Sequence, residues 1–324
     1  MIKEIEIKNF KTIKRLKLSC KRINIFIGDP NAGKSNLLEA LSLLNYNFRN
    51  LSDFIRFHEV THLFNDYDTS QNIEIRADNH ISRVRVDADS DMLHVENFKE
   101  LNSPFLIKYF SDGKLQSSSH NDSINLLPRV LFYRYKQNVV FEKSQNFYLT
   151  PPFGENLPSI VLSNKGLRTL VQNILDDLGF KLLIKPSGND FEIVRESGGI
   201  SLSFPLISFS DTIKRIIFYL AAIKSNSGNT ILFEEPEAHT FPFYTKGLAE
   251  TIALDASNQF FIITHNPVLL MSMIQKVKLS DLSVNLVKMK DYQTMVTELS
   301  EDAVERILEL DSDLFLNFEK LLSE

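Results

Sequence analysis

The 324-residue chain has little cysteine, no tryptophan and no long apolar run. Its single cysteine, Cys20, excludes an internal disulfide and a metal site built of several thiolates, which is typical of a reducing compartment. The longest uninterrupted apolar run, residues 216–223, is far shorter than the roughly 20 residues of a membrane-spanning helix. The first eight residues alternate apolar with charged side chains and do not resemble a secretory signal. We therefore expect a cytoplasmic protein with no membrane partner.

The charge of the chain is moderate in total but uneven along its length. Hydrophobic residues make up 43% and charged residues 24%, which is typical of a globular protein and not of a disordered or fibrous one. The formal net charge is −5, yet residues 1–24 carry eight basic and two acidic side chains, whereas residues 296–324 carry two and nine. These totals do not indicate a strongly basic nucleic-acid binder. A solvated strand pair and a solvated acidic helix explain the two ends.

Short apolar runs predict β-structure in the first half of the chain. Residues 2–7 alternate with period two and residues 23–27 are rich in β-branched side chains, so we expect two strands at the start. Leucines at helical spacing predict a helix over residues 36–47. Residues 115–123 contain three consecutive serines and are expected to form a mobile loop. An antiparallel subdomain is predicted within residues 72–150, with strands at 72–75, 81–86, 105–110 and 130–135.

Strands and helices alternate in the second half of the chain. The predicted helices are residues 167–178, a helix capped by Ser210, residues 243–254 and the acidic helix 301–310. The predicted strands are residues 181–184, 191–194, 230–233 and 259–263, with a turn at 186–189 and two short strands near the C-terminus. This alternation predicts a parallel sheet, and we expect both ends of the chain to contribute to it.

Residues 28–35 read Gly-Asp-Pro-Asn-Ala-Gly-Lys-Ser and match the phosphate-binding loop G-x-x-x-x-G-K-[ST] between a predicted strand and a predicted helix. Glycines let the backbone wrap an anion, Lys34 can place its ammonium on the β- and γ-phosphates, and Ser35 can ligate Mg²⁺. The sequence therefore predicts a phosphate-binding loop that acts with Mg²⁺. The candidate nucleotide-binding residues are Gly28, Asp29, Pro30, Asn31, Ala32, Gly33, Lys34, Ser35 and Asn36.

Two later strands end in polar side chains that suit the same chemistry. Residues 231–237 form an apolar strand ending in acids, of which Glu234 is expected to hold Mg²⁺ and Glu235 to orient or deprotonate the attacking water. His265 follows the next strand and is expected to act at the γ-phosphate. The catalytic candidates are thus Lys34, Glu235 and His265. The alternative for Glu234 and Glu235 is that a strand simply ends in a charged turn. The alternative for His265 is a structural role at the edge of the sheet.

These motifs, with the helix led by Ser210, resemble the ABC-class ATPase heads of SMC and RecF proteins. The chain looks closest to the AAA ATPase domain of the OLD, Gabija and RecF-like group. The resemblance implies that residues 28–35 are the Walker A loop, that Glu234 and Glu235 are the Walker B pair, and that His265 is the switch histidine. Ser210 would be the signature serine, which in that family reaches ATP bound to the opposite subunit. A homodimer that sandwiches ATP is therefore implied, with residues 237–239 crossing between the two sites.

The fold class expected from motifs and resemblance is an α/β P-loop NTPase with a mixed sheet like that of an ABC-ATPase head. An antiparallel β subdomain and a helical lobe are expected between Walker A and Walker B, because 201 residues separate Lys34 from Glu235. We expect one composite head over residues 1–324. Its expected parts are a nucleotide-binding core of residues 1–50 and 205–290, an inserted lobe of residues 51–204, and an acidic C-terminal tail with a helix, residues 291–324.

The expected function is Mg²⁺-dependent hydrolysis of ATP by a dimer that regulates a separate effector or nuclease protein, in DNA repair or antiviral defence. The alternative is an ATP-gated DNA-binding clamp with little hydrolysis, in which basic N-terminal side chains contact phosphates. Its candidate residues are Lys11, Lys14, Arg15, Lys17, Lys21 and Arg22. A transporter subunit is disfavoured by the long β-rich insertion. A nuclease in the same chain is disfavoured because no acidic cluster with metal-site order follows His265. The 25 phenylalanines are most simply side chains of the core, although Phe10 could contact the nucleotide base.

Overall fold

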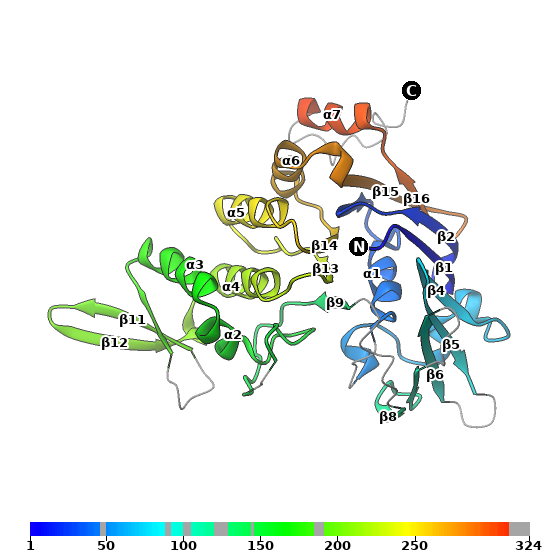
Figure 1. Ribbon diagram of the computed structural model, residues 1–324, viewed down its shortest axis with the longest axis horizontal. Helices are drawn as coiled ribbons and strands as arrows, with labels where there is room; N and C mark the ends of the chain where they lie inside the picture. The colour runs from blue at the N-terminus through cyan, green and yellow to red at the C-terminus, as the bar shows by residue number, and fades with distance from the viewer. Residues whose placement is uncertain are drawn as a thin grey trace.

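The computed structural model describes residues 1–45, 50–87, 92–99, 105–119, 129–143, 146–184 and 191–310. Within these residues the strands form three sheets, which Figure 1 shows with their covering helices. The sheet that carries the predicted motifs, here called the core sheet, has six strands. In spatial order they are β16 (Gln293–Glu298), β15 (Leu282–Lys290), β3 (Ile23–Gly28), β14 (Gln259–Ile263), β13 (Thr230–Glu234) and β9 (Val130–Tyr133).

Five strands of the core sheet run parallel, and β16 is antiparallel to β15. Every residue of β3 and β14 is buried, as expected for parallel strands that are covered on both faces. Since side chains alternate along a strand, Phe26 and Phe261 face one layer while Ile25 and Phe260 face the other. The strand β3 lies between β14 and β15, which confirms the prediction that both ends of the chain share one sheet.

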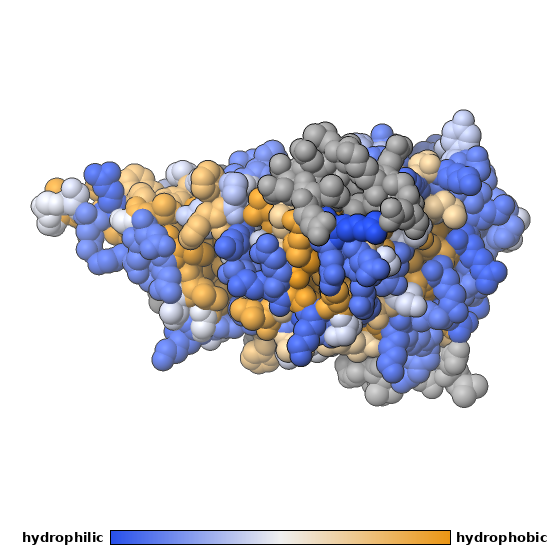
Figure 2. Space-filling model, turned by 90° about the horizontal axis from the view of Figure 1, so that it is seen from above, coloured by the Kyte–Doolittle hydropathy of each residue, from blue (hydrophilic) through white to orange (hydrophobic). Residues whose placement is uncertain are grey.

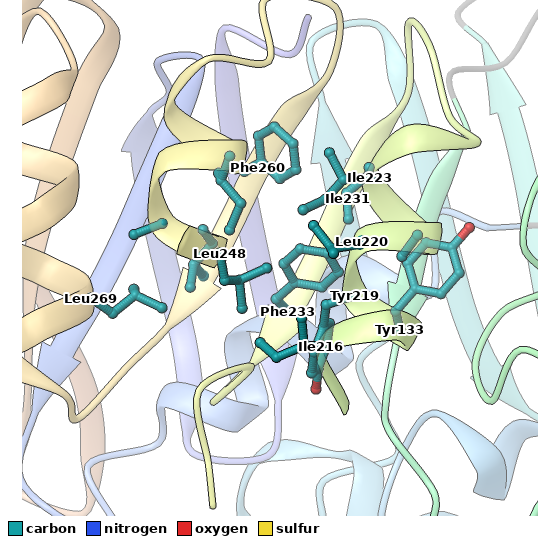
Figure 3. Close-up of a cluster of buried hydrophobic side chains, with 14 of the residues drawn as sticks. Tyr133, Ile216, Tyr219, Leu220, Ile223, Ile231, Phe233, Leu248, Phe260 and Leu269 are labelled. Atoms are coloured by element: carbon teal, nitrogen blue, oxygen red, sulfur yellow. The ribbon is translucent and has the colours of Figure 1, made fainter. Parts of the chain in front are cut away.

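Helices cover both faces of the core sheet. One face packs against α1 (Lys34–Ser42), and the other against α4 (Asp211–Lys224), α5 (Pro242–Ala253) and α6 (Pro267–Lys276). Figure 3 shows the second face, where Tyr219 and Leu220 of α4 and Leu248 of α5 pack around Phe233 and Phe260 of the sheet. Burial of such large apolar side chains contributes about 1.5–3 kcal/mol each to folding. The strands that carry the motifs are therefore buried between helices on both faces of the sheet.

The second sheet is antiparallel and has seven strands within the described residues. In spatial order they are β2 (Ile13–Ser19), β1 (Glu4–Phe10), β4 (Ile73–Ala77), β5 (His80–Val86), β6 (Leu93–Lys99), β7 (Phe105–Tyr109) and β8 (Leu115–Ser118). Its buried side chains, such as Ile7 and Ile75, belong to the same cluster as Leu37 and Leu41 of α1. The helix that follows the phosphate-binding loop therefore lies between two sheets.

The remaining elements lie at the edges of the core. Figure 1 shows α3 and a three-stranded sheet projecting on the side opposite to the antiparallel sheet. These elements are α2 (Leu157–Ser163), α3 (Lys165–Asp176), β10 (Lys181–Ile184), β11 (Phe191–Ser197) and β12 (Ile200–Pro205). The acidic helix predicted for residues 301–310 is α7 (Glu301–Leu310), and it contacts α6. Figure 2 shows that apolar surface gathers over α3 and α5. The short 3-10 helices are η1 (Leu51–Asp53), η2 (Val60–Leu63), η3 (Asn65–Tyr67), η5 (Leu206–Ser208) and η6 (Leu279–Asp281).

Several sequence predictions are wrong in detail. Residues 130–135 were expected in the antiparallel subdomain, but β9 pairs in parallel with β13 in the core sheet. Period-two patterning marks a strand without naming its partner, and the four buried residues of β9 fit the interior of an α/β sheet. Residues 115–118 form β8, an exposed strand at the edge of the second sheet, and not a loop. The turn at 186–189 and the ends of the predicted loop, helix and tail, residues 120–123, 46–47 and 311–324, lie outside the described residues.

The strands β2, β6 and β12 and the helices α2 and α6 are present without having been predicted. No helix among the described residues combines the length and the apolarity that crossing a membrane requires.

Candidate functional site

The phosphate-binding loop connects β3 to α1 and needs glycine at two positions. Gly28 has φ 145°, and a Cβ built there would lie 2.0 Å from the carbonyl oxygen of Val287 in the neighbouring strand β15. Gly33 has φ 91°, and its Cβ would lie 1.9 Å from Oγ1 of Thr294 in β16. Both φ values are in the region that favours glycine. The loop is therefore pressed against the core sheet at both ends, which fixes its curvature.

The N-terminus of α1 is suited to an anion. Gly33 occupies the N-cap position and supplies no side-chain hydrogen bond to the first turn. The first N–H groups of a helix have no partner within the helix, and the helix dipole places partial positive charge there. Phosphate oxygens are the ligands that such uncapped N-termini bind in loops of this sequence. The exposed backbone donors thus fit the phosphates of a nucleotide.

Lys34 lies inside the curve of the loop. Its Nζ donates hydrogen bonds to the carbonyl oxygens of Gly28 at 2.8 Å and Asp29 at 2.6 Å. Burial lowers the pKa of Lys34, and the negative charges of Glu235 and Asp29 oppose that shift. The ammonium is thereby held beside the N-terminus of α1 and is attracted by the carboxylate of Glu235.

Glu235 and His265 meet at the carboxyl edge of the core sheet. The parallel pairing of β13 with β14 sets Glu234 opposite Ile263, so the residues that follow both strands emerge at one edge. The His265 Nε2 lies 3.5 Å from the Glu235 Oε1. Burial lowers the pKa of His265, the positive charge of Lys34 lowers it further, and Glu235 opposes both effects. The structure therefore gathers the three catalytic candidates, Lys34, Glu235 and His265, around one site.

Glu235 adopts an unusual backbone conformation. Its φ is 45°, in the left-handed region, while its N–H still donates to the carbonyl oxygen of Ile263 at 2.9 Å. Such a conformation costs a non-glycine residue on the order of 1 kcal/mol and persists where the surrounding structure imposes it. The turn leaves the carboxylate 46% exposed at the edge of the sheet. Of the two adjacent acids Glu234 and Glu235, Glu235 is thus the more accessible.

A buried carboxyl group, Glu237, connects the turns after the two strands. Its Oε1 accepts hydrogen bonds from Thr264 Oγ1 at 2.5 Å and from the His265 N–H at 3.3 Å. Burial raises its pKa to about 7, and within the described residues its Oε2 has no hydrogen-bond partner. The resemblance implied only that Glu237 lies in a crossing segment. Its sequence context, an acid three residues after Glu234, does not reveal that it holds the backbone of His265.

Glu234 is flanked by two arginines that sequence reasoning missed. Its Oε2 lies 3.1 Å from Nη2 of Arg134, and its Oε1 lies 3.8 Å from Nη2 of Arg56. Arg56 also pairs through Nε, at 2.7 Å, with Glu39, whose side chain is fully buried on α1. Lys11 forms a second, short ion pair with Glu39, and burial lowers the pKa of Lys11 despite that partner. The metal-ligand candidate thus belongs to a chain of alternating charges that ends in the β1–β2 turn.

The donor set offered for a metal is made of oxygen atoms, the hydroxyl of Ser35 and the carboxylate of Glu234. Mg²⁺ prefers such hard ligands and usually keeps several waters beside one or two protein oxygens. The chemistry of these residues therefore fits Mg²⁺, although the Glu234 oxygens pair with guanidinium groups in this structure.

Ser210 is the N-cap of α4, as predicted, and its Oγ accepts from the Ile213 N–H at 3.4 Å. The side chain lies at the surface and has no hydrogen bond to residues 28–35 in the described part of the chain. Thr212 donates to the carbonyl oxygen of His239 at 2.9 Å, so the start of α4 is tied to the turn after β13.

Two nucleotide-contact candidates are engaged by other parts of the protein. The Asn36 side chain donates to Thr12 Oγ1 at 2.8 Å, which directs its amide toward the turn between β1 and β2. Phe10 is fully buried in the core shared by α1 and the antiparallel sheet. The prediction that phenylalanines fill the core is therefore confirmed for Phe10, and its alternative role, contact with a nucleotide base, is wrong because the ring lies in the core beneath α1.

Comparison with known proteins supports this fold. Residues 1–155, just under half of the chain, match the family model described as "AAA ATPase domain". Among curated proteins no match was found.

Two solved structures of SMC heads are similar over nearly the whole chain. The crystal structure of the SmcHead bound to the C-winged helix domain of ScpA has 16% identity and a TM-score of 0.56, covering 94% of this chain and 99% of that one. The Smc head domain with an extended coiled coil, bound to the C-terminal domain of ScpA derived from Pyrococcus furiosus, has 15% identity and a TM-score of 0.50. It covers 95% of this chain and 98% of that one. The chain therefore has a mixed α/β P-loop NTPase fold that resembles SMC heads and carries an antiparallel β subdomain.

Proposed function

We propose that this protein is an ATPase that binds ATP with Mg²⁺ at residues 28–35 and hydrolyses it to ADP and phosphate. The observation that carries the proposal is the convergence of Lys34, Glu235 and His265 beside an uncapped helix N-terminus. The match of residues 1–155 to an AAA ATPase domain model supports the same activity.

Each side chain has a role that its position supports. Lys34 and the N–H groups at the start of α1 would bind the phosphates, and Ser35 and Glu234 would hold a metal ion, which would neutralise charge on the phosphate oxygens. Glu235, accessible at the sheet edge, orients and deprotonates the attacking water. His265, kept close to Glu235 and in the field of Lys34, stabilises charge that develops on the γ-phosphate.

The turnover of Lys34→Ala tests this function. Loss of the ammonium should weaken ATP binding and abolish steady-state phosphate release, while a circular-dichroism spectrum like that of wild type shows that the fold is retained. Phosphate release at the wild-type rate would contradict the assignment of residues 28–35.

The proposal includes a homodimer in which Ser210 of one subunit reaches ATP bound by the other. The exposed position of Ser210 and its lack of hydrogen bonds to residues 28–35 of its own chain support this arrangement. Mixing inactive Lys34→Ala and Ser210→Ala subunits should restore about one quarter of the activity, because half of the dimers then contain one intact composite site. No recovery in a mixture that exchanges subunits would refute the shared site.

The proposal extends to a separate effector or nuclease partner, in DNA repair or antiviral defence, and to a relation with the OLD, Gabija and RecF-like group. The SMC head whose structure is similar was solved with a bound domain of another protein, which supports a head that works through a partner. Co-purification of the tagged protein with the product of a neighbouring gene, dependent on ATP and lost in Lys34→Ala, tests the partner.

The DNA-clamp alternative receives less support from the structure than from the sequence. Five of its six basic candidates have partners within the protein. These are Lys11 with Glu39, Arg15 with Glu6, Lys17 with Glu4, Lys21 with the carbonyls of Leu279 and Leu282, and Arg22 with those of Ala253 and Asp255. Five of the six candidate side chains are therefore engaged within the folded protein and are less free to contact DNA phosphates. DNA binding that weakens strongly between 50 mM and 200 mM salt would restore this alternative.

A further inference from the structure

Both carboxylate oxygens of Glu234 are engaged by positive charge. Its side chain is 17% exposed at the end of β13, with Oε2 at 3.1 Å from Arg134 and Oε1 at 3.8 Å from Arg56. The 3.1 Å contact is within hydrogen-bond range, whereas the 3.8 Å contact is only an ion pair. Arg134 is therefore the principal partner of Glu234.

Arg134 is fixed by its own strand. It directly follows β9, which pairs in parallel with β13 so that Tyr133 lies opposite Phe233. Continuing this register by one residue brings Arg134 beside Glu234. The Arg134 N–H donates to the carbonyl oxygen of Pro152 at 2.9 Å, and its guanidinium lies 5.3 Å from the centre of the Phe132 ring. The ion pair thus joins residues at the ends of two neighbouring strands.

Arg56 is held in a different way. Its guanidinium is 57% exposed, and its closest partner is Glu39 at 2.7 Å. Glu39 is fully buried, so Arg56 is needed there as a counter-charge. The contact of Arg56 with Glu234 is longer and secondary, and loss of Arg134 would leave Glu234 without a hydrogen-bonded cation.

A carboxylate that accepts a hydrogen bond from a guanidinium has fewer lone pairs to offer to a metal ion, and the nearby positive charge repels a second cation. We propose that Arg134 is a positioning residue whose guanidinium occupies the carboxylate of Glu234 and keeps cations from it. A metal ion then binds Glu234 only when this guanidinium moves away. The proposal rests on the proposed function, because Glu234 serves a metal only in the ATP site.

The test compares ATP affinity with and without metal, measured as binding of a fluorescent ATP analogue in excess Mg²⁺ and in excess EDTA. The ratio of the two dissociation constants is the metal enhancement, and it requires no turnover. Arg134→Gln should increase this enhancement about five- to tenfold, which corresponds to one charge-assisted hydrogen bond between partly exposed groups. Arg134→Met replaces the guanidinium beside Phe132 with an uncharged side chain of similar length, and the same increase is expected.

Two controls separate this effect from general changes. Glu234→Gln should decrease the enhancement, and adding Arg134→Gln to that variant should change nothing further, since the two groups act on each other. Arg85→Gln removes an arginine that pairs with Glu96 at 3.4 Å in the antiparallel sheet, and it should leave the enhancement unchanged. Melting temperatures near that of wild type show that each variant is folded.

The outcomes are distinguishable. An unchanged or smaller enhancement in folded Arg134→Gln and Arg134→Met would overturn the role of Arg134 while leaving the ATPase proposal intact. A wild-type protein that binds no ATP analogue in Mg²⁺ would overturn the proposed function itself.

Discussion

The buried carboxyl of Glu237 makes the stability of this protein depend on pH in a way that a single substitution removes. Glu237 is 4% exposed, and burial raises its pKa to about 7 from the ordinary value of 4.5. An acid whose folded pKa is raised binds more protons in the native state than in the unfolded state between these two values. Its protonated form is therefore favoured at low pH, and stability is lost as pH rises through about 7.

The size of the effect follows from the shift. A difference of this size between folded and unfolded pKa corresponds to roughly 3 kcal/mol once the group is ionised in both states. Glu237→Gln keeps an acceptor for Thr264 Oγ1 and for the His265 N–H but cannot ionise. The stability of Glu237→Gln relative to wild type should therefore increase by roughly 3 kcal/mol between pH 4.5 and pH 8.5.

Urea unfolding of both proteins at the two pH values measures this change. Taking the difference between variant and wild type cancels the titration of all other groups. Glu305→Gln makes the same substitution at an exposed position on α7 and is the matched control. A difference between Glu237→Gln and wild type that is the same at pH 4.5 and pH 8.5 would refute the reasoning.

The remaining predictions concern the loop and the charge chain. Gly33→Ala should destabilise the protein by about 2 kcal/mol in urea unfolding and abolish binding of an ATP analogue, because its Cβ would meet Thr294 at a left-handed backbone position. Gly247→Ala, in the interior of α5 with open space around it, should instead stabilise by about 0.5–1 kcal/mol. Glu39→Gln should cost about 3 kcal/mol in the same assay, since it leaves the buried ammonium of Lys11 without its counter-charge. Stability of Glu39→Gln equal to that of wild type would show that Lys11 finds another partner.

Much of the fold was predictable because its signals are local. A window of about 15 residues contains the whole pattern that predicts each of three features. These are the strand–loop–helix unit around residues 28–35, the capped helix α4 and the acidic helix α7. Because residues that follow neighbouring parallel strands emerge at the same edge of the sheet, the proximity of Glu235 and His265 also follows from the sequence.

The groups that sequence reasoning missed depend on pairing between distant segments. Arg134 reaches Glu234 only because β9 joins the core sheet, and a period-two pattern does not name its partner strand. Arg56 reaches Glu39 because α1 packs against the antiparallel sheet and the segment that connects them. Phe10 was open to a role at the nucleotide because nothing in its sequence context shows that its ring is buried beneath α1. Contacts of this kind are fixed by tertiary packing and have no local signature.

The central claim of this account is that residues 28–35 and Glu235 form one site in which ATP is bound and then hydrolysed. Glu235→Gln separates the two steps, since it removes the carboxylate that acts on the water and leaves the phosphate-binding loop intact. We predict that this variant binds ATP as tightly as wild type while its single-turnover phosphate release is slower by about 100-fold or more. Phosphate release at the wild-type rate by ATP-bound Glu235→Gln would contradict the claim.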